Sequence, residues 1–379
     1  MDFSLTKHEE LFLQMIREFA EKEVKPLAAE IDEEERFPIE TVEKMSKLGL
    51  MGIPFPTEYG GAGGTSQIYS MAVEELSRVC GTTGVVLSAH TSLCGAPIFE
   101  MGTEEQKKKY LPKLCSGEWI GAFGLTEPNA GTDAGAQQTT AVATEDGYVL
   151  NGSKIFITNA EYAHVYIVIA MTDKPLGIKG ISAFIVEKGT PGFSIGKKEK
   201  KLGIRGSATC ELIFENCVIP KENLLGKVNE GFKVAMKTLD GGRIGIAAQA
   251  LGIAQGAMDE TVKYVKERKQ FGKPIGQFQN TQFQLADLDT KIEASRLLVR
   301  IAAHKKDKKQ AYSVDAARAK LFAAETAMEV TVKAVQFHGG YGYTRDYPVE
   351  RMMRDAKITE IYEGTSEVQR MVISANLLK

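Results

Sequence analysis

The spacing of apolar residues changes twice along this chain, and that change limits the folds the chain can adopt. Through residues 5–115 the apolar side chains recur at helical intervals, as at Met15 and Phe19. Through residues 121–223 they alternate with polar ones, which is the period of a strand. After Gly231 the helical interval returns and continues toward the C-terminus. The order is therefore helices, then strands, then helices.

This order predicts an α+β protein with three domains. We expect an N-terminal helical domain at residues 1–120, a middle antiparallel β domain at residues 121–228, and a C-terminal four-helix bundle at residues 229–379. In that bundle the C-terminal helix would join three long helices, whose apolar residues recur around residues 244–265, 288–301 and 317–335.

Two glycine-containing segments suggest turns. Asn151-Gly152 separates two strand-like runs and is typical of a β-hairpin. The cluster at residues 60–64 invites comparison with a phosphate-binding loop, but no Gly-Lys-Ser/Thr follows it and the third glycine of a dinucleotide fingerprint is missing. We therefore interpret the cluster as a flexible connection. The predicted strands are Tyr148–Leu150, Lys154–Thr158, Val165–Ala170, Ile181–Val186 and Glu211–Phe214.

Charge and cysteine content exclude several classes of function. Forty-seven basic residues against 49 acidic ones give a formal net charge of −2, which argues against nucleic acid or an anionic membrane as the main partner. The five cysteines are odd in number and include no CxxC pair, so neither a disulfide framework nor a metal site is expected. The N-terminus lacks a signal-peptide pattern, and no apolar run is long enough to span a membrane. We expect a protein of the reducing cytoplasm.

The segment around Glu363 is the part of the sequence that says most about function. Gly364 follows it directly, and helical spacing begins at Val368, so a helix should start at or beside Ser366, which has capping-box spacing with Gln369. A junction glycine permits positive φ or the close approach of a ligand, and a helix N-terminus offers free N–H groups. Two interpretations stay open: an ordinary surface turn, or a site in which Glu363 performs chemistry.

Four stretches, taken in order, resemble the acyl-CoA dehydrogenase family over essentially the whole chain. They are Leu125–Asp133, Lys154–Asn159, Glu267–Gly272 and Gln336–Gly342, the last of which leads to the Glu363 segment. The resemblance is closest to the short-chain, butyryl-CoA-type enzymes of anaerobic bacteria. It implies the acyl-CoA dehydrogenase-like fold, with the three domains in the order given above, and FAD as the cofactor.

The resemblance implies that Glu363 is the catalytic base. The family removes a proton from the carbon α to a thioester and passes hydride from the β carbon to flavin N5, and Glu363 matches the residue that takes the proton. Its backbone N–H would hold the thioester carbonyl together with a flavin hydroxyl, and burial would raise its pKa from about 4.3 toward about 6 to 7. Some family members place the base just before the arginine that is here Arg243, but this chain has Gly242 there.

The same resemblance assigns contacts to substrate and cofactor. Without the resemblance, we would interpret Asp240 as a helix-start residue, Arg243 as a surface residue and Phe156 as a core residue of the β domain. The resemblance places Phe156 behind the flavin, where the family often has tryptophan. The implied substrate-binding residues are Thr132, Asp240, Arg243 and Gly364. The resemblance also implies FAD contacts at Phe123, Leu125, Thr126, Thr132, Phe156, Ile157, Thr158, Phe278, Thr365 and Glu367.

Further FAD contacts would come from a neighbouring subunit. His338 lies in this region but is expected to be structural rather than catalytic. A cofactor shared between subunits implies an obligate oligomer, which in this family is usually a homotetramer. The residues concerned are Arg268, Gln270, Phe271, Gln336, Phe337, Gly339 and Gly340.

The expected function is FAD-dependent interconversion of a short acyl-CoA and its 2-enoyl-CoA, with electrons exchanged with an electron-transferring flavoprotein. The alternative within this class is a reductase for another enoyl-CoA, such as acryloyl-CoA or an aryl-acrylyl-CoA like caffeyl-CoA, in an electron-bifurcating complex. Nitroalkane oxidation or oxygen delivery on the same fold is disfavoured, because those enzymes do not use a glutamate at the Glu363 position. A non-enzymatic helical interaction protein is the remaining hypothesis.

Overall fold

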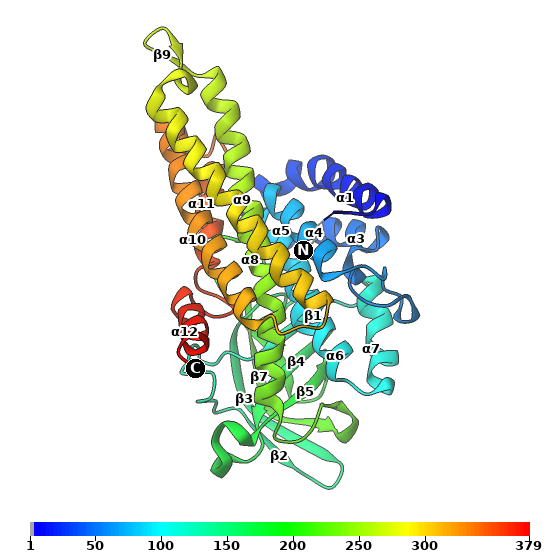
Figure 1. Cartoon of the computed structure of the whole chain (residues 1–379). Helices are drawn as coiled ribbons and strands as arrows, with labels where there is room; N and C mark the ends of the chain where they lie inside the picture. The colour runs from blue at the N-terminus through cyan, green and yellow to red at the C-terminus, as the bar shows by residue number, and fades with distance from the viewer. Residues whose placement is uncertain (1–3) are drawn as a thin grey trace.

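Helices form the N-terminal part of the chain in the computed structural model, which describes residues 4–379 (Figure 1). Threonine side chains cap three of them, since Thr6, Thr65 and Thr103 each accept a backbone N–H of the following first turn. The helices are α1 (Lys7–Phe19), α2 (Ala28–Glu33), α3 (Ile39–Lys47), α4 (Ser66–Val79), α5 (Gly81–Ser88), α6 (Ala96–Met101) and α7 (Glu104–Ser116), with π-helical segments η1 (Ala20–Val24) and η5 (Ala89–Gly95).

The glycine cluster at residues 60–64 joins α3 to α4 as an ordered turn, not as the flexible connection predicted. The N–H of Gly63 donates to the carbonyl of Phe55 and that of Gly64 to the carbonyl of Ile53, both at 2.8 Å. A Cβ atom at Gly61 would lie 2.2 Å from the Phe55 carbonyl oxygen. The glycines are therefore needed for close packing of the backbone.

One sheet of eight strands forms the middle of the chain, in the order β6-β7-β3-β2-β4-β5-β8 with β1 beside β4. Its pairings are antiparallel, as predicted, except that β1 and β2 each pair with β4 in parallel. The strands are β1 (Gly121–Gly124), β2 (Thr140–Ala143), β3 (Gly147–Ile157), β4 (Val165–Met171), β5 (Ile181–Glu187), β6 (Phe193–Lys198), β7 (Cys210–Pro220) and β8 (Leu224–Leu225).

The hairpin predicted at Asn151-Gly152 is wrong, because β3 runs straight through these residues. Its pairing with β7 shifts register between Leu150 and Gly152, which is a β-bulge. Gly152 has φ of +140°, and a Cβ there would lie 2.6 Å from Oγ1 of Thr139 on the neighbouring segment. The glycine thus serves a close approach inside a long strand rather than a turn.

Three long helices dominate the C-terminal part, and two short ones, α11 and α12, pack against α10. α8 begins against β5, where a Cβ at Gly231 would lie 2.2 Å from the backbone of Ser182, and it runs to a two-stranded tip formed by β9 and β10 (Figure 1). The elements are α8 (Gly231–Glu267), β9 (Lys269–Gln270), β10 (Lys273–Pro274), α9 (Gln279–Asp307), α10 (Ser313–His338), α11 (Val349–Ile358) and α12 (Ser366–Leu377).

The largest hydrophobic core joins the first and last parts of the chain. Apolar residues of α1 to α5 and of α8 to α11 form one buried cluster, and two further clusters cover the two faces of the sheet. Helices give way to strands between Ser116 and Gly121, and strands give way to helices between Leu225 and Gly231. These transitions support the domain limits that we propose at residues 120/121 and 228/229.

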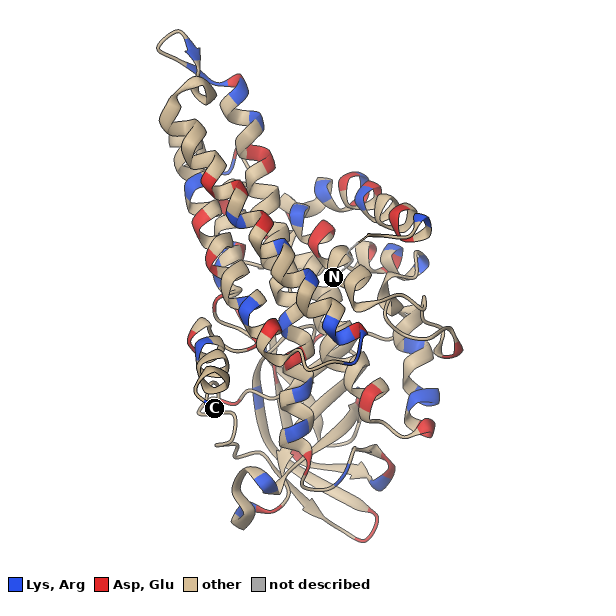
Figure 2. Cartoon of the chain, in the orientation of Figure 1, with Lys and Arg blue, Asp and Glu red and all other residues tan. Residues whose placement is uncertain are grey.

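Acidic and basic residues are interspersed along the helices in the view of Figure 2. This distribution agrees with the small net charge of −2. Within residues 4–379 no helix is long and apolar enough to cross a membrane. The same residues contain no group of histidine, cysteine, aspartate and glutamate side chains that could hold a metal ion.

Candidate active site

Glu363 lies in the turn between α11 and α12 with left-handed backbone geometry, at φ of +52°. α12 begins at Ser366 as predicted, but its N-cap is Thr365, whose hydroxyl accepts the N–H of Val368 at 3.3 Å. Gln369 does not complete a capping box; its side-chain amide donates to the Gly364 carbonyl at 2.7 Å. Side chains at the start of α12 therefore hold the turn that follows Glu363.

The carboxylate of Glu363 points into the protein and not into solvent. Its Oε2 atom is buried and has no hydrogen-bond partner among the described residues. Burial raises the pKa of Glu363 to about 8, against the positive charges of Lys320 and Arg243, which lower it. This value lies above the range of about 6 to 7 expected from the sequence. The interpretation of Glu363 as an ordinary surface turn residue is wrong.

Gly242 makes room for this carboxylate. A Cβ atom at Gly242 would lie 2.1 Å from Oε2 of Glu363 and 2.8 Å from Cδ2 of Leu93. Any side chain at position 242 would occupy the space that the carboxylate now fills. The sequence identified Gly242 as the position of a rival base, and the structure places it directly beside Glu363.

The buried Arg243 and the half-buried Asp240 form an ion pair on the same stretch of α8. Nη1 of Arg243 donates to Oδ1 of Asp240 at 2.6 Å, and the hydroxyl of Ser313 donates to the same oxygen at 2.9 Å. Arg243 is only 4% exposed, and its Nε atom has no partner among the described residues. Both residues lie inside α8, so the interpretation as a helix-start aspartate and a surface arginine is wrong.

Two groups beside Glu363 were missed by the sequence analysis. Lys320 on α10 is fully buried and donates from Nζ to the Gly364 carbonyl at 2.7 Å. Tyr362 donates its hydroxyl to the Gln249 side chain on α8. A signal for Lys320 did exist, since it lies on a stripe with Ala316 and Ala323 where a solvated lysine is not expected.

The two family stretches that begin at Leu125 and Lys154 form one packed unit. The N–H of Ile155 donates to the Thr126 carbonyl at 2.9 Å, and Nζ of Lys154 donates to the Leu125 carbonyl at 3.2 Å. The same Nζ lies 2.6 Å from Oε1 of Glu127, and both side chains are buried. A buried ion pair therefore joins the Thr126 loop to β3, a contact that the sequence analysis did not predict.

Phe156 is 60% exposed, so its interpretation as a core residue is wrong. Its φ of +59° and the register shift of β3 between Lys154 and Ile157 turn the side chain outward. Phe156 is thus an exposed aromatic surface beside the Thr126 backbone. Among the other residues expected near the flavin, Thr126 and Thr158 are half-buried, Thr132 is exposed, and the side chains buried in the core are Phe123, Leu125 and Ile157.

The residues expected to serve a neighbouring subunit lie at the far end of α8. Phe271, at the turn between β9 and β10, is 95% exposed, and Arg268 lies over the ring of Tyr341. At a helical rise of about 1.5 Å per residue, about 39 Å of α8 separate Gly242 from Arg268. The exposed Gln270 and the half-buried Phe278 belong to the same tip. The structure therefore does not bring these residues to Glu363 within one chain.

The end of α10 lies near this tip. Gly339 and Gly340 are exposed, with open space where a Cβ would stand. His338 is buried, its ring stacks on Tyr264 with centroids 4.2 Å apart, and its Nδ1 lies 2.8 Å from the Ala334 carbonyl oxygen. This packing agrees with a structural role for His338. Of the other expected cofactor residues, Gln336 and Glu367 are exposed, Phe337 is half-buried, and Thr365 caps α12.

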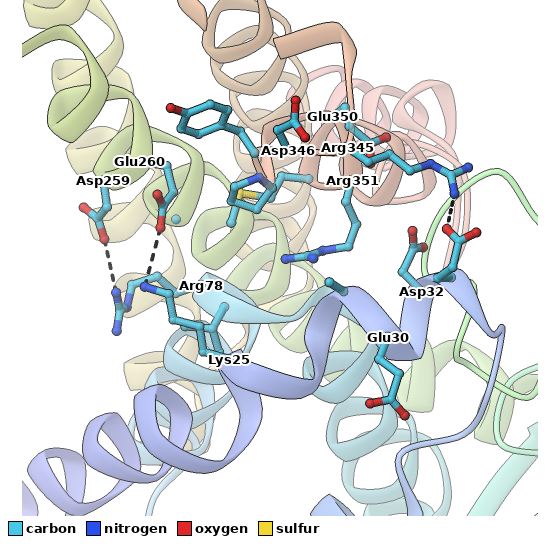
Figure 3. A pocket seen from close by; sticks show the side chains of 17 residues that line it. Lys25, Glu30, Asp32, Arg78, Asp259, Glu260, Arg345, Asp346, Glu350 and Arg351 are labelled. Atoms are coloured by element: carbon cyan, nitrogen blue, oxygen red, sulfur yellow. Dashed lines mark hydrogen bonds and ion pairs between the residues drawn. The ribbon is translucent and has the colours of Figure 1, made fainter. Parts of the chain in front are cut away.

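A second concentration of charge lies in a cavity of about 550 Å³ between α2, α8 and α11, away from every predicted site residue (Figure 3). Arg78 pairs with Asp259 at 3.2 Å, and Lys25 pairs with Glu260 at 3.5 Å. Each acidic side chain that lines this cavity has a basic or hydroxyl partner among the described residues. We call it the charged cavity below.

A buried carboxylate oxygen without a hydrogen-bond partner among the described residues, beside Gly242 of α8 and near the buried Lys320 of α10, is typical of an enzyme active site. Models of the acyl-CoA dehydrogenase family match its N-terminal domain at residues 6–118, its middle domain at 122–217 and its C-terminal domain at 229–378. The chain belongs to the acyl-CoA dehydrogenase family and is an oxidoreductase.

Three curated relatives illustrate the range of the family near this chain. A short-chain specific acyl-CoA dehydrogenase of Clostridium acetobutylicum is 66% identical over the full length of both chains. An acryloyl-CoA reductase (NADH) of Anaerotignum propionicum is 53% identical, covering 100% of this chain and 96% of the relative. A 3-(aryl)acrylate reductase of Clostridium sporogenes is 51% identical and covers 99% of both.

Solved structures agree with the fold over the full chain. Butyryl-CoA dehydrogenase from Megasphaera elsdenii superimposes with a TM-score of 0.98 at 53% identity, covering 100% of both chains. A structure from work on the electron transferring flavoprotein of Acidaminococcus fermentans gives 0.99 at 59% identity, also over 100% of both. A glutaryl-CoA dehydrogenase from Mycobacterium smegmatis in complex with FADH2 gives 0.93 at 31% identity, covering 98% of this chain and 95% of that one.

Proposed function

We propose that this enzyme interconverts a short-chain acyl-CoA and its 2-enoyl-CoA, with Glu363 taking or giving the proton at the α carbon. The observation that carries the proposal is the Oε2 atom of Glu363, which is buried, has no hydrogen-bond partner among the described residues and lies against Gly242. A carboxylate kept in this state is free to bond to a substrate proton. The family's butyryl-CoA and short-chain members support the substrate class.

Glu363 can serve in both directions of such a reaction. To take a proton it must be ionised, and to give one it must be protonated. With a pKa of about 8, both forms are populated near neutral pH. Within residues 4–379 the backbone N–H of Glu363 makes no hydrogen bond, so it is available to the thioester oxygen, where negative charge develops in either direction.

FAD is the cofactor of this enzyme, and when bound it accepts or supplies the hydride at the β carbon. The residues present fit it. The exposed ring of Phe156 offers a flat wall, and the half-buried Thr126 and Thr158 supply hydroxyl groups beside that wall. The Lys154–Glu127 ion pair would hold the Thr126 loop in place against β3. Arg243 and Asp240 would orient the acyl-CoA next to Glu363, with Thr132 and Gly364.

We propose a homotetramer in which each FAD also contacts a neighbouring subunit. The support is the length of α8, which places Arg268, Gln270 and Phe271 about 39 Å along the helix from Gly242. These residues are exposed, as are Gln336, Gly339 and Gly340 at the nearby end of α10. An aromatic side chain that is 95% exposed, as Phe271 is, is better explained by a contact with another chain than by solvent.

We further propose an electron-transferring flavoprotein as the redox partner. The support is the near-identical fold of the structure obtained in the work on the flavoprotein of Acidaminococcus fermentans, whose subject is flavin-based electron bifurcation. An enzyme of this kind that uses a bifurcating partner would run in the direction of enoyl-CoA reduction.

The second candidate is a reductase for a different 2-enoyl-CoA, such as acryloyl-CoA or an aryl-acrylyl-CoA like caffeyl-CoA. The observation that favours it is the identity of 53% and 51% to relatives named as acryloyl-CoA and 3-(aryl)acrylate reductases. A panel of acyl-CoA and enoyl-CoA esters, assayed in both directions with a dye and with the flavoprotein, separates the candidates by which ester gives the highest kcat/KM.

The test of the proposed chemistry is Glu363→Gln, with Glu260→Gln in the charged cavity as a matched control. Both variants replace a half-buried glutamate by its neutral isostere. We expect Glu363→Gln to keep its FAD and to lose turnover by roughly a thousandfold, while Glu260→Gln stays near the wild type. Turnover of butyryl-CoA by Glu363→Gln at a near-normal rate would refute the assignment of the base.

A further inference from the structure

Lys320 is a buried cation without a buried anion as direct partner. Its side chain is 0% exposed, and no carboxylate of the described residues lies within ion-pair distance of Nζ. Within residues 4–379, its Nζ makes one hydrogen bond, to the Gly364 carbonyl at 2.7 Å. Placing a charge in the interior without a partner is costly, and such groups are found where function requires them.

Lys320 and Gln369 hold the same carbonyl oxygen. The Gln369 side-chain amide also donates to the Gly364 carbonyl at 2.7 Å, so α10 and α12 both bond to this one backbone group. Gly364 has φ of +95° and Glu363 has φ of +52°, which a residue other than glycine rarely adopts. The two donors thus fix a turn that the Glu363 backbone would not keep alone.

The charges of Lys320 and Glu363 act on each other. Burial lowers the pKa of Lys320 to about 8, while the negative charge of Glu363 raises it. Reciprocally, the positive charge of Lys320 favours the ionised form of Glu363. Two buried groups of opposite sign, both titrating near pH 8, stabilise each other's charged forms.

Other charged groups face this pair from each surrounding element. Arg243 on α8 also favours the ionised form of Glu363, but its charge is already matched by Asp240 at 2.6 Å. Tyr69 on α4 and Tyr362 in the turn stay neutral, because burial raises the pKa of both hydroxyls. Glu360 and Glu367 face Lys320 from the turn and from α12. Lys320 is therefore the nearby cation whose charge has no paired carboxylate.

We propose that Lys320 is a positioning residue for Glu363: its ammonium group holds the Gly364 carbonyl, and with it the left-handed turn that aims the carboxylate, and its positive charge favours the ionised form of Glu363, which accepts the proton. This inference rests on the proposed function, since it concerns the same site. It adds to that function a residue on α10 that does not touch the substrate and acts through the turn.

The test compares Lys320→Met with Gln369→Met. Both remove one hydrogen bond to the Gly364 carbonyl, but only Lys320→Met removes a charge. The measurement is kcat/KM for oxidation of butyryl-CoA against pH, since this profile reports the pKa of the free enzyme's base. We expect Lys320→Met to move the acidic limb upward by about one pH unit, so that kcat/KM falls roughly tenfold at pH 7.

The direction of the reaction supplies an internal check. Oxidation needs ionised Glu363, so loss of the Lys320 charge moves activity to higher pH. Reduction of crotonyl-CoA needs protonated Glu363, so the same variant should stay active to a pH about one unit higher than the wild type. Gln369→Met should lower the plateau of both profiles without moving either limb. Lys320→Arg, which keeps the charge, should keep the wild-type limb.

Three outcomes would overturn the proposal. One is a Lys320→Met enzyme whose limbs lie where those of the wild type lie. Another is a Gln369→Met enzyme that shifts as far as Lys320→Met. The third is that neither Lys320→Met nor Lys320→Gln folds while Lys320→Arg is normal, which would assign Lys320 a structural role. Failure of the proposed function is recognised separately, because Glu363→Gln would then retain turnover.

Discussion

The charged cavity and the Glu363 site both gather charged side chains against α8, but they differ in how far those charges are paired and how deeply they are buried. In the charged cavity, Lys25 pairs with Glu260, Arg78 with Asp259, and Arg345 with Glu33, close to water (Figure 3). Exposed or half-exposed pairs of this kind contribute little to stability, because water and salt screen them.

At the Glu363 site the charges are buried and incompletely matched. Oε2 of Glu363, Nε of Arg243 and Oε1 of Gln369 are buried and have no hydrogen-bond partner among the described residues. Nζ of Lys320 bonds to a backbone carbonyl and not to a carboxylate. Leaving such groups unsatisfied costs stability, and these three gather around the Glu363 turn, where we propose that the substrate binds.

In this molecule the pairing of charges, more than their number, distinguishes the Glu363 site from the charged cavity. The charged cavity gathers more charged side chains than the Glu363 site, and it carries none of the residues that we assign to the reaction. A paired charge has its bond already, whereas a buried unpaired one is available to a substrate. Four changes can break or sharpen this distinction, from the largest expected effect to the smallest.

Lys154→Met tests a buried charge that is paired with a buried charge of opposite sign. The change leaves the buried Glu127 carboxylate without its ion-pair partner, although the N–H groups of Gln138 and Thr139 still donate to it. We expect the free energy of unfolding to fall by about 3 to 5 kcal/mol, together with weaker FAD retention. Chemical denaturation measures the first and flavin absorbance the second. The double variant Lys154→Met/Glu127→Gln should recover part of the loss; a loss below about 1 kcal/mol in the single variant would contradict the reasoning.

Gly242→Ala tests whether the space beside the unmatched carboxylate matters. The new Cβ would lie 2.1 Å from Oε2 of Glu363, so the carboxylate must move. We expect kcat/KM to fall roughly a hundredfold, as for a displacement of about 1 Å in an active site. Gly241→Ala is the matched control, since its Cβ would meet only the flexible end of Lys306, at 2.9 Å. Equal activity of the two variants would show that the reaction does not need the space at Gly242.

Glu363→Gln should change stability in a pH-dependent manner. Because the pKa of Glu363 is about 8 in the folded protein and 4.5 in its unperturbed state, the folded state holds the proton more tightly. The wild type therefore loses stability as pH rises from about 4.5 to about 8, and the amide variant does not. We expect the variant to be more stable than the wild type at pH 8.5 and equal in stability at pH 4.5. Thermal unfolding at both pH values decides the point.

Lys25→Met in the charged cavity should have the smallest effect. Lys25 pairs with Glu21 at 3.2 Å and with Glu260 at 3.5 Å, and its side chain is 47% exposed. We expect a change in the free energy of unfolding below about 0.5 kcal/mol and an unaltered kcat/KM. A tenfold loss of activity in this variant would show that the cavity belongs to the functional machinery and would break the comparison.

The periodicity of the sequence was sufficient for the order of domains and for the long helices, because amphipathic helices carry their burial pattern locally. It failed where a distant segment decides the conformation. Asn151-Gly152 has the composition of a hairpin, but Gly152 lies inside β3 because it must approach Thr139 closely. Phe156 follows the alternation of a buried strand residue, but a bulge turns it outward.

The residues of the site and the upward direction of the Glu363 pKa were predictable from the family resemblance, but the size of the pKa shift and the groups around Glu363 were not. The family resemblance selected Glu363, Asp240 and Arg243, and the structure places all three on the turn and the stretch of α8 around Gly242. The high pKa of Glu363 and the bond from Lys320 depend on how α8, α10 and the turn pack together. The only local signal of this packing was that Lys320 lies on a stripe of alanines. The sequence pattern does not reveal that Lys320 bonds to the Gly364 carbonyl.

The uninterrupted length of α8 has a consequence for how this family can vary. The helix runs from Gly231 to Glu267 without a break, so one end fixes the position of the other. Inserting a single residue between Gly242 and Glu267 would rotate the β9–β10 tip by about 100° and advance it by about 1.5 Å. We therefore expect an inserted residue to be tolerated in an exposed segment such as Lys174–Gly180 but not within α8.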